Sequence, residues 1–446
     1  MTSVLSFAFV LGVLVFFHEL GHFVVARLHG VRCLTFALGF GPKLVQTKRG
    51  DTVYCICAIP LGGYVKMAGA GEGPDDKPEG KDDEFLSKTK WQRFQILIAG
   101  PVMNIILAVL ILAGVLYQGV TVPVYLEQPP IVGIVPDGSA AATAGIQAGD
   151  SILSVAGRNV DTWEEMGLAV APYADQEIDV VLRRDGGERT VQVTPESRGT
   201  FKVGVLGVEP DVPPQPPQVV DMMSTTSSAA QEAGILVGDV IEAIEGREVT
   251  TESLMAKIQA SPDIPLMLRI RRDGVRQDIV VTPQLVGDVG KIGVALNTPY
   301  EMHIIEPGPF EAFAMSLEQN YETSGLLFQT VWGLLKRDVP VTQLAGPVGI
   351  LQLSGQAVGV SWVVFFGFMS MLSLNLGILN LLPIPILDGG HIFIMAMEGV
   401  SRRDFSVRLK ERIALAGFVL LMTLIVTVTY NDLARFPWIE RLMIWR

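Results

Sequence analysis

Four long apolar runs divide the chain into stretches suited to lipid and stretches suited to water. They lie at about 4–26, 94–117, 359–382 and 413–430, and each is bounded by charged residues or by Pro and Gly. About 20 apolar residues in a helix can cross a hydrocarbon layer of roughly 30 Å. The pattern predicts a multi-pass α-helical membrane protein with four transmembrane helices. The first run has no basic leader and no small-residue cleavage site, so we expect it to stay in the mature protein.

Composition and charge separate the apolar ends from an acidic middle. Hydrophobic residues make up 49% of the chain, and its mean hydropathy of +0.40 is high for a soluble protein. Residues 127–300 contain 13 Lys and Arg against 25 Asp and Glu, which accounts for the whole net charge of -12. We expect a soluble module inserted between membrane segments. Its acidity argues against a nucleic-acid partner.

Basic residues predict the orientation of the chain in the membrane. They cluster after the first apolar run, before the second and between the last two. Loops rich in Lys and Arg stay cytoplasmic. The acidic module and both termini should then be periplasmic, with the protein in the inner membrane of a bacterium.

The acidic module contains an internal repeat. AGIQAGD at 144–150 returns as AGILVGD at 233–239, an offset of 89 residues, and the proline-rich stretch 213–217 separates the copies as a stiff linker. Short β-branched runs alternate with turn residues in each copy, a pattern that resembles tandem PDZ-like α+β domains. PDZ domains bind extended peptides at a sheet edge, so peptide ligands on the periplasmic side are expected. The alternative is a steric cap that grips no ligand.

The sequence His-Glu-Leu-Gly-His lies inside the first apolar run. His18 and His22 are one helical turn apart, about 6 Å, so both imidazoles can reach one zinc ion. Glu19 is placed to accept a proton from a water molecule that zinc activates. The alternative is a set of polar residues lining a proton or ion path.

A catalytic zinc site normally has three protein ligands, so a third residue is needed. Asp388 lies in the apolar stretch 380–393, where two Pro and two Gly break the helix. Broken backbone at membrane depth is tolerated where it lines a cavity, so we expect a cleft there. Asp388 is favoured over His391, which lies beyond the two glycines. An Asp before Gly-Gly can also be a simple turn residue.

The three cysteines, Cys33, Cys55 and Cys57, all precede residue 60. No disulfide is expected. Metal binding by the Cys-x-Cys pair is less favoured than packing, because both side chains share one face of an alternating strand.

Together these motifs resemble the site-2 protease family of intramembrane zinc metalloproteases, in its bacterial RseP type (regulator of sigma-E protease). The likeness covers nearly the whole chain. Leu20 stands where the family more often has Phe, at a position that is no ligand. The other matching segments are PLGGYVKM at 60–67, Gly100-Pro101 with Asn104, and Asn380-x-x-Pro383 leading to Leu387-Asp388-Gly389.

The resemblance implies one zinc ion on His18, His22 and Asp388, with Glu19 as the general base. It implies that Asn380 positions the substrate and that 34–69 is a membrane re-entrant β-segment. The substrate would pair with that segment's edge, at Gly62, Gly63 and Tyr64. The alternative is a cytoplasmic hairpin that only packs against the helices.

Apolar positions at helical spacing over 306–340 predict an amphipathic helix that gates the cleft or anchors the repeats. The whole chain is then expected to have five parts. They are an N-terminal membrane core (1–126), two PDZ-like domains (127–212 and 218–300), an amphipathic helical connector (301–357) and a C-terminal membrane core (358–446).

The expected function is hydrolysis of peptide bonds in transmembrane segments of single-span proteins already trimmed on the periplasmic side. The resemblance suggests an anti-sigma factor and remnant signal peptides as substrates, in envelope-stress signalling, with the active site toward the cytoplasmic side. Two alternatives are a PDZ-bearing membrane scaffold and an ion transporter. An open zinc position argues against the scaffold, and the lack of an inverted membrane repeat argues against the transporter.

Overall fold

The structure is a computed structural model of the 446-residue chain. It divides into a membrane unit (Met1–Val120, Ser197–Val203 and Ile304–Arg446) and an inserted unit (Thr121–Glu196 and Gly204–His303). The first two linker prolines, Pro213 and Pro214, and the end of the expected 306–340 helix lie outside the described residues. The structure describes residues 2–70, 78–198, 203–212, 215–222, 229–286, 289–297, 300–336 and 344–434.

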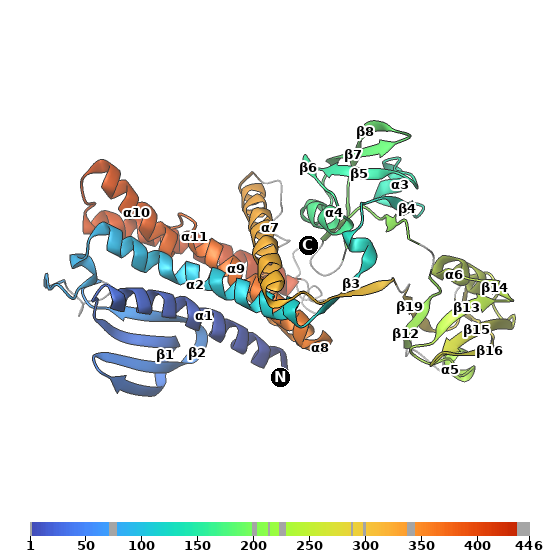
Figure 1. Cartoon of the computed structure of the whole chain (residues 1–446), viewed down its shortest axis with the longest axis horizontal. Helices are drawn as coiled ribbons and strands as arrows, with labels where there is room; N and C mark the ends of the chain where they lie inside the picture. Colours follow the sequence, from blue (N-terminus) through green and yellow to red (C-terminus); the bar gives the residue numbers. More distant parts are fainter. Residues whose placement is uncertain are drawn as a thin grey trace. The chain divides into compact units, whose positions relative to one another are not determined.

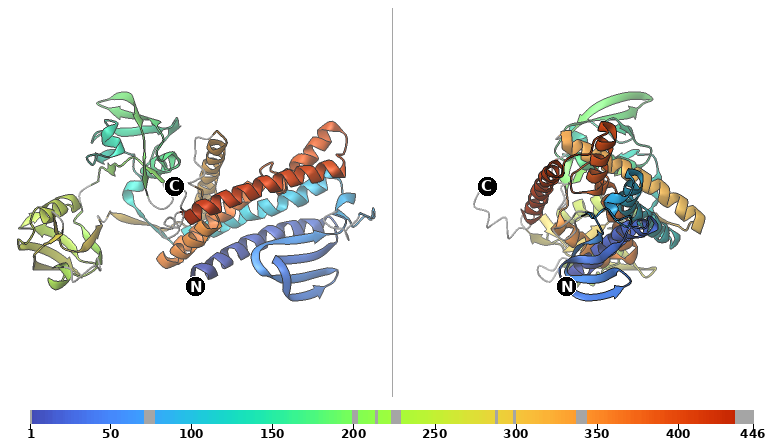
Figure 2. Two further views of the ribbon diagram at one scale, coloured as in Figure 1. Left: turned by 180° about the vertical axis from the view of Figure 1, so that it is seen from behind. Right: turned by 90° about the vertical axis from the view of Figure 1, so that its left-hand side faces the viewer.

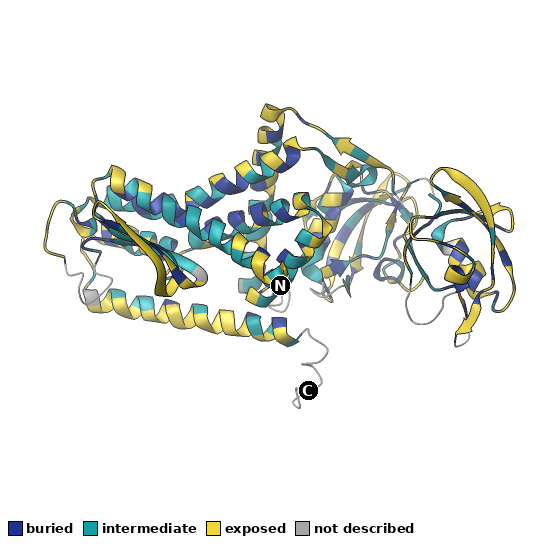
Figure 3. Cartoon of the chain, turned by 90° about the horizontal axis from the view of Figure 1, so that it is seen from below, coloured by how far each residue is buried: buried dark blue, intermediate teal, exposed yellow. Residues whose placement is uncertain are grey.

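Four helices of the membrane unit are long and apolar enough to cross a membrane, counted over the described residues. Figures 1 and 2 show α2 alongside both α1 and α9, in agreement with their contacts. The helix α11 is exposed along most of its length (Figure 3), including Leu415 and Val426, as expected of a surface that faces hydrocarbon. The four are α1 (Thr2–Leu28), α2 (Lys90–Tyr117), α9 (Trp362–Asn380) and α11 (Val407–Ala434).

Small and hydroxylated residues hold the helices of the membrane unit together. A Cβ on Gly21 of α1 would overlap the Ala99 carbonyl of α2, so glycine allows the two helices to approach closely. Ser370 and Ser373 of α9 donate hydrogen bonds of 2.8 Å to backbone carbonyls of α2. Such bonds suit a lipid environment, where hydrophobic burial does not drive helix association.

Three further α-helices and one short 3-10 helix also belong to the membrane unit. The helix α7 is two-sided: Ala312, Ser316 and Asn320 are buried, while Phe310 and Tyr321 are exposed. Ser316 donates a hydrogen bond of 2.7 Å to the Val109 carbonyl of α2. The elements are η1 (Phe85–Ser87), α7 (Pro309–Lys336), α8 (Pro347–Val360) and α10 (Asp388–Ser401).

The hairpin β1 (Cys33–Arg49) and β2 (Thr52–Met67) forms a sheet beside α1 (Figure 1). Each strand folds back on itself. Residues 33–38 pair on one side with 63–67 and on the other with 53–56, and 43–49 then pair with the start of β2. Within this sheet, 63–67 therefore form one edge. This edge lies next to α1, where a Cβ on Gly63 would overlap the Val15 side chain.

The inserted unit contains two copies of one arrangement. In each copy a short helix precedes a strand, and a second helix leads to an antiparallel hairpin. The first copy comprises β4 (Val132–Ile134), α3 (Ala140–Thr143), β5 (Ser151–Val155), β6 (Arg158–Asn159), α4 (Trp163–Val170), η3 (Ala171–Tyr173), β7 (Ile178–Arg184), β8 (Gly187–Val193) and β11 (Glu209–Pro210). The paired strands β9 (Glu196–Arg198) and β10 (Val203–Val205) contain residues of both units, since Ser197–Val203 are assigned to the membrane unit. The second copy comprises β12 (Gln218–Met222), α5 (Ala229–Glu232), β13 (Val240–Ile244), β14 (Arg247–Glu248), α6 (Thr251–Gln259), β15 (Leu266–Arg272), β16 (Val275–Val281), β17 (Gln284–Val286), β18 (Val289–Lys291) and β19 (Val294–Asn297). The chain enters and leaves through β3 (Val120–Pro123), η2 (Val124–Glu127) and β20 (Met302–Ile305).

The repeated Gly-Asp has the same structural role in both copies. Asp150 accepts two hydrogen bonds of 2.6 Å from Arg184 and one of 2.8 Å from the Gln147 backbone N–H. Asp239 is bound in the same way by Arg272 and the Leu236 N–H. Each arginine also donates to a glycine carbonyl at the end of the preceding short helix. The repeat in the sequence thus preserves a buried ion pair that ties a loop to a hairpin.

Candidate metal centre

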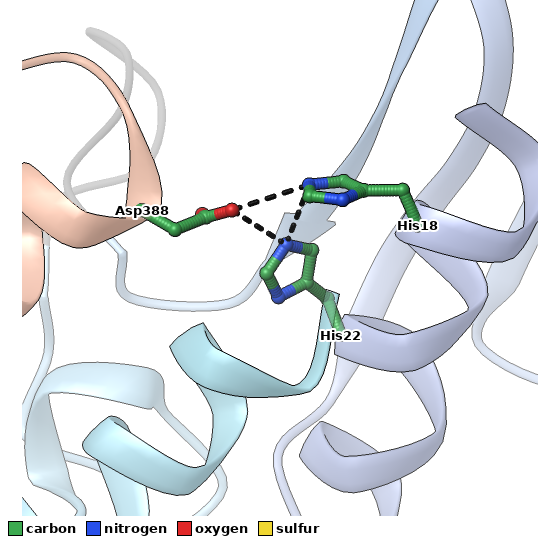
Figure 4. A group of neighbouring side chains, drawn as sticks. All are labelled: His18, His22 and Asp388. Atoms are coloured by element: carbon green, nitrogen blue, oxygen red, sulfur yellow. Dashed lines mark hydrogen bonds and ion pairs between the residues drawn. The ribbon is translucent and has the colours of Figure 1, made fainter. Parts of the chain in front are cut away.

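His18 and His22 lie one turn apart on α1, and their rings meet on the side that packs against α2 (Figure 4). Both residues are buried. Their Nε2 atoms are 3.3 Å apart. The helical spacing therefore directs two nitrogen donors to one point inside the membrane unit.

Asp388 is the first residue of α10 and follows the break after α9. The break is tight: a Cβ on Gly389 or Gly390 would overlap backbone carbonyls of residues 381–384. The two glycines thus allow the chain to turn within a few residues. The turn brings Asp388 Oδ2 to 3.2 Å from His18 Nε2 and 3.5 Å from His22 Nε2 (Figure 4).

The three donor atoms fit a zinc ion. Bonds of about 2.0–2.2 Å in a tetrahedron place ligand atoms roughly 3.3–3.6 Å apart. The three separations here are 3.2, 3.3 and 3.5 Å. Two imidazoles and one carboxylate leave the fourth position for water or substrate, as in catalytic zinc sites. Among the residues that the structure describes, these three form the one group of His, Cys, Asp or Glu side chains close enough to share a metal ion.

Groups on α2 lie against the rings of both histidines. His22 Nδ1 is 2.8 Å from the Ile96 carbonyl, a contact that requires Nδ1 to carry the proton and leaves the Nε2 lone pair free. A Cβ on Gly100 would overlap the His22 ring, so this glycine makes room for it. The amide nitrogen of Asn104 lies 3.4 Å from His18 Nδ1.

Glu19 is half-buried and belongs to the same turn of α1. The Val65 backbone on β2 lies beside its carboxylate. A Cβ on Gly63 would lie 3.1 Å from Glu19 Cγ. The edge of the β1–β2 sheet and the carboxylate of Glu19 are therefore in contact.

The remaining candidate residues differ in position and burial. Gly62, Gly63 and Tyr64 lie on β2, where the Tyr64 ring stacks with Phe40. Asn380 is half-buried and is the last residue of α9, eight positions before Asp388 at the start of α10. His391, the alternative ligand, is exposed.

The cysteines are free and buried. Cys55 and Cys57 pack in one small cluster with Ala37 and Tyr64, on the face opposite to Ile56. Cys33 belongs to a separate cluster beside α1.

Sequence reasoning did not assign roles to Ile96, Gly100 or Asn104. Only Asn104 carries a signal of its own, because a fully buried amide in an apolar helix needs a polar partner. The Ile96 carbonyl and Gly100 give no such signal in the sequence. Their contacts with His22 depend on how α1 and α2 pack.

Comparison with known proteins identifies the class. The model of peptidase family M50 matches residues 6–424. The chain therefore belongs to peptidase family M50, which confirms the resemblance drawn from the motifs.

Individual relatives agree along nearly their whole length. The chain is 32% identical to the regulator of sigma-E protease RseP of Salmonella typhimurium over 448 residues, covering 96% of this chain and 98% of that protein. It is 31% identical to the protein of the same name from Escherichia coli, with the same coverage. A relative from Vibrio cholerae, 30% identical over 97% of this chain, has the words zinc metalloprotease in its name.

These findings establish the enzyme class. The chain is a membrane-embedded zinc metalloprotease of the site-2 type. The scaffold and transporter alternatives are not favoured.

Proposed function

We propose that His18, His22 and Asp388 hold one zinc ion per chain and that Glu19 is the general base for peptide-bond hydrolysis within the membrane. The observation that carries the proposal is the spacing of the three donor atoms, 3.2–3.5 Å, at the spacing of zinc ligands. A divalent cation held between the two imidazoles and Asp388 would neutralise the charge of that carboxylate.

A zinc ion held by His18, His22 and Asp388 would polarise the scissile carbonyl and would lower the pKa of a water at its fourth position to about 7. Glu19 takes up the proton of the attacking water and passes it to the departing amine. The 63–67 edge lies beside the Glu19 side chain and limits how far it can move between the two transfers. His18 and His22 remain ligands throughout, each oriented by α2.

We propose that the substrate binds as an extended strand along the 63–67 edge. A transmembrane helix must unwind before its peptide bonds can be attacked, and a sheet edge replaces the hydrogen bonds that unwinding breaks. Gly63 and Tyr64 begin this edge, Gly62 directly precedes it, and Gly63 lies next to Glu19. Asn380, just before the turn that carries Asp388, would position the opposite side of the substrate.

The substrates we propose are single-span membrane proteins already trimmed outside the membrane, including an anti-sigma factor and remnant signal peptides. The names of the relatives support this choice. The two repeats are assigned as PDZ-like domains that bind periplasmic peptides or exclude bulky ectodomains. Both termini and these domains would be periplasmic, with β1 and β2 as a re-entrant segment near the cytoplasmic side.

Replacing Glu19 by Gln tests the proposal. The variant should keep one equivalent of zinc by elemental analysis, because Glu19 is no ligand. Its cleavage of a single-span model substrate in detergent should fall about 10²–10⁴-fold, the usual contribution of a general base. Glu411→Gln, the same change at an exposed position on α11, is the matched control and should cleave normally. Undiminished cleavage by Glu19→Gln would remove Glu19 from the mechanism.

A further inference from the structure

Asn104 is fully buried on α2, one turn beyond Gly100, and its side chain lies beside the His18 ring. Its amide nitrogen is 3.4 Å from His18 Nδ1. Its amide oxygen has no hydrogen-bond partner within the described part of the chain. A buried amide oxygen without a partner is costly, so the arrangement calls for an explanation.

The chemistry of His18 supplies that explanation. His18 Nε2 is the atom next to Asp388 and His22, so its lone pair is the one available to a cation. A neutral imidazole with a free Nε2 carries its proton on Nδ1. An amide N–H₂ facing an N–H would set donor against donor. Turning the amide by 180° puts its oxygen at this contact, where it accepts the Nδ1 proton, and moves the amide nitrogen to the place that the oxygen now occupies. The turn replaces a donor facing a donor by a hydrogen bond.

His22 shows the same arrangement with a different acceptor. Its Nδ1 contacts the Ile96 carbonyl at 2.8 Å, also from α2. Ile96 and Asn104 are eight residues apart, about two turns of one helix, while the two histidines are one turn apart on α1. One helix thus presents an acceptor to each imidazole. At His22 the acceptor is a backbone carbonyl, and at His18 the group of α2 that lies against Nδ1 is the Asn104 side chain.

We infer that Asn104 is a positioning residue, which accepts the His18 Nδ1 proton through its amide oxygen and so presents Nε2 to the metal. The inference rests on the proposed zinc site. Asn104 would then accept the Nδ1 proton of His18, as the Ile96 carbonyl accepts the Nδ1 proton of His22. Outer hydrogen bonds of this kind typically change metal affinity 10–100-fold.

Two substitutions at the same position separate the acceptor from the packing. Asn104→Leu keeps the approximate shape and removes the acceptor, and should weaken zinc binding 10–100-fold in competition with a chelator. Asn104→Asp has acceptor oxygens in either orientation and should restore affinity to within a few-fold of the wild type. With Co²⁺ in place of zinc, the visible absorption bands of Asn104→Leu should shift, and those of Asn104→Asp should resemble the wild type.

The matched control is Ser370→Ala. Ser370 is buried and donates to the Ala108 carbonyl of α2, one turn beyond Asn104, so its loss disturbs the same helix contact without touching a histidine. Zinc affinity and the Co²⁺ spectrum should not change in this variant. An equal loss in Ser370→Ala and Asn104→Leu would mean that helix packing alone is responsible, and would overturn the inference.

The zinc-loaded wild type gives a test that needs no substitution. With ¹⁵N-labelled histidine the chain has five imidazoles, of which two should be metal-bound. Both should show coordination through Nε2 and a protonated Nδ1. Coordination of either through Nδ1 would overturn the inference, as would unchanged affinity in Asn104→Leu. Absence of zinc from the wild type would instead overturn the proposed function, and the inference with it.

Discussion

Buried carboxylates in the two units of the molecule have different partners. In the inserted unit, Asp150 is 1% exposed and receives two hydrogen bonds from Arg184. In the membrane unit, Asp388 is 17% exposed and faces two imidazoles. Arginine is charged at every accessible pH, so Asp150 is neutralised by the chain itself. The partners of Asp388 are imidazoles, which can bind a metal ion as well as a proton.

The difference distinguishes a structural carboxylate from one prepared for a ligand. In the ion pair of the repeats both carboxylate oxygens of Asp150 accept hydrogen bonds, and the same three bonds return at Asp239. At Asp388 the chain supplies donors of electron pairs from all three residues. Three lone pairs directed at one point are what the proposed zinc ion would bind.

The largest effect is expected when Asp388 is replaced by Asn. Loss of a charged ligand should lower zinc affinity more than 100-fold, beyond the range of outer-shell changes, and should abolish cleavage. Elemental analysis and a chelator competition measure the affinity. Asp150→Asn is the matched change in the inserted unit and should retain zinc. One full equivalent of zinc in Asp388→Asn would point to another ligand, with His391 the first to test.

A smaller effect is expected when the arginine of one repeat is removed. Arg184→Met leaves Asp150 buried without its partner, which should cost about 2 kcal/mol, at the low side for a buried pair because Arg184 is 17% exposed. Hydrogen exchange read by mass spectrometry on the full chain should show faster exchange in β5 and β7 only. The second repeat is an internal control, and Arg272→Met should reverse the pattern. Equal exchange in both repeats would show that the pair contributes no local stability.

The two units also differ in how far sequence reasoning reaches. The spacing of His18 and His22 predicts their convergence, because helical geometry is local. Asp388 could be selected by its setting, a break inside an apolar run, although 366 residues separate it from His22. The contact between Asn104 and His18 could not be predicted, since it depends on the register of two packed helices. The return of β1 and β2 on themselves depends on glycines at positive φ, including Gly39 and Gly62, which the alternating pattern does not reveal.

The smallest effect is expected from acid, and it sharpens the contrast between the repeats and the metal centre. Burial raises the pKa of Asp150, but the hydrogen bonds from Arg184 and the Gln147 N–H outweigh it and hold the pKa below its ordinary value. The pKa of Asp239 is lowered in the same way by Arg272 and the Leu236 N–H. An unfolded Asp titrates near pH 3.9. The stability that each pair contributes is therefore complete above about pH 4–5 and is lost as the pH falls toward the folded-state pKa.

Each repeat binds at most one extra proton per Asp on unfolding in this range, so the slope is at most about 1.4 kcal/mol per pH unit. Hydrogen exchange between pH 5 and pH 3, corrected for the intrinsic rate, should show both repeats opening more readily in acid. Asp150→Asn has no carboxyl to titrate, so the first repeat should lose this pH dependence while the second keeps it. An unchanged pH dependence in the first repeat of Asp150→Asn would assign the acid sensitivity to other groups. The Asp150–Arg184 pair would then be a packing feature without an electrostatic share in stability, and the contrast with Asp388 would rest on zinc binding alone.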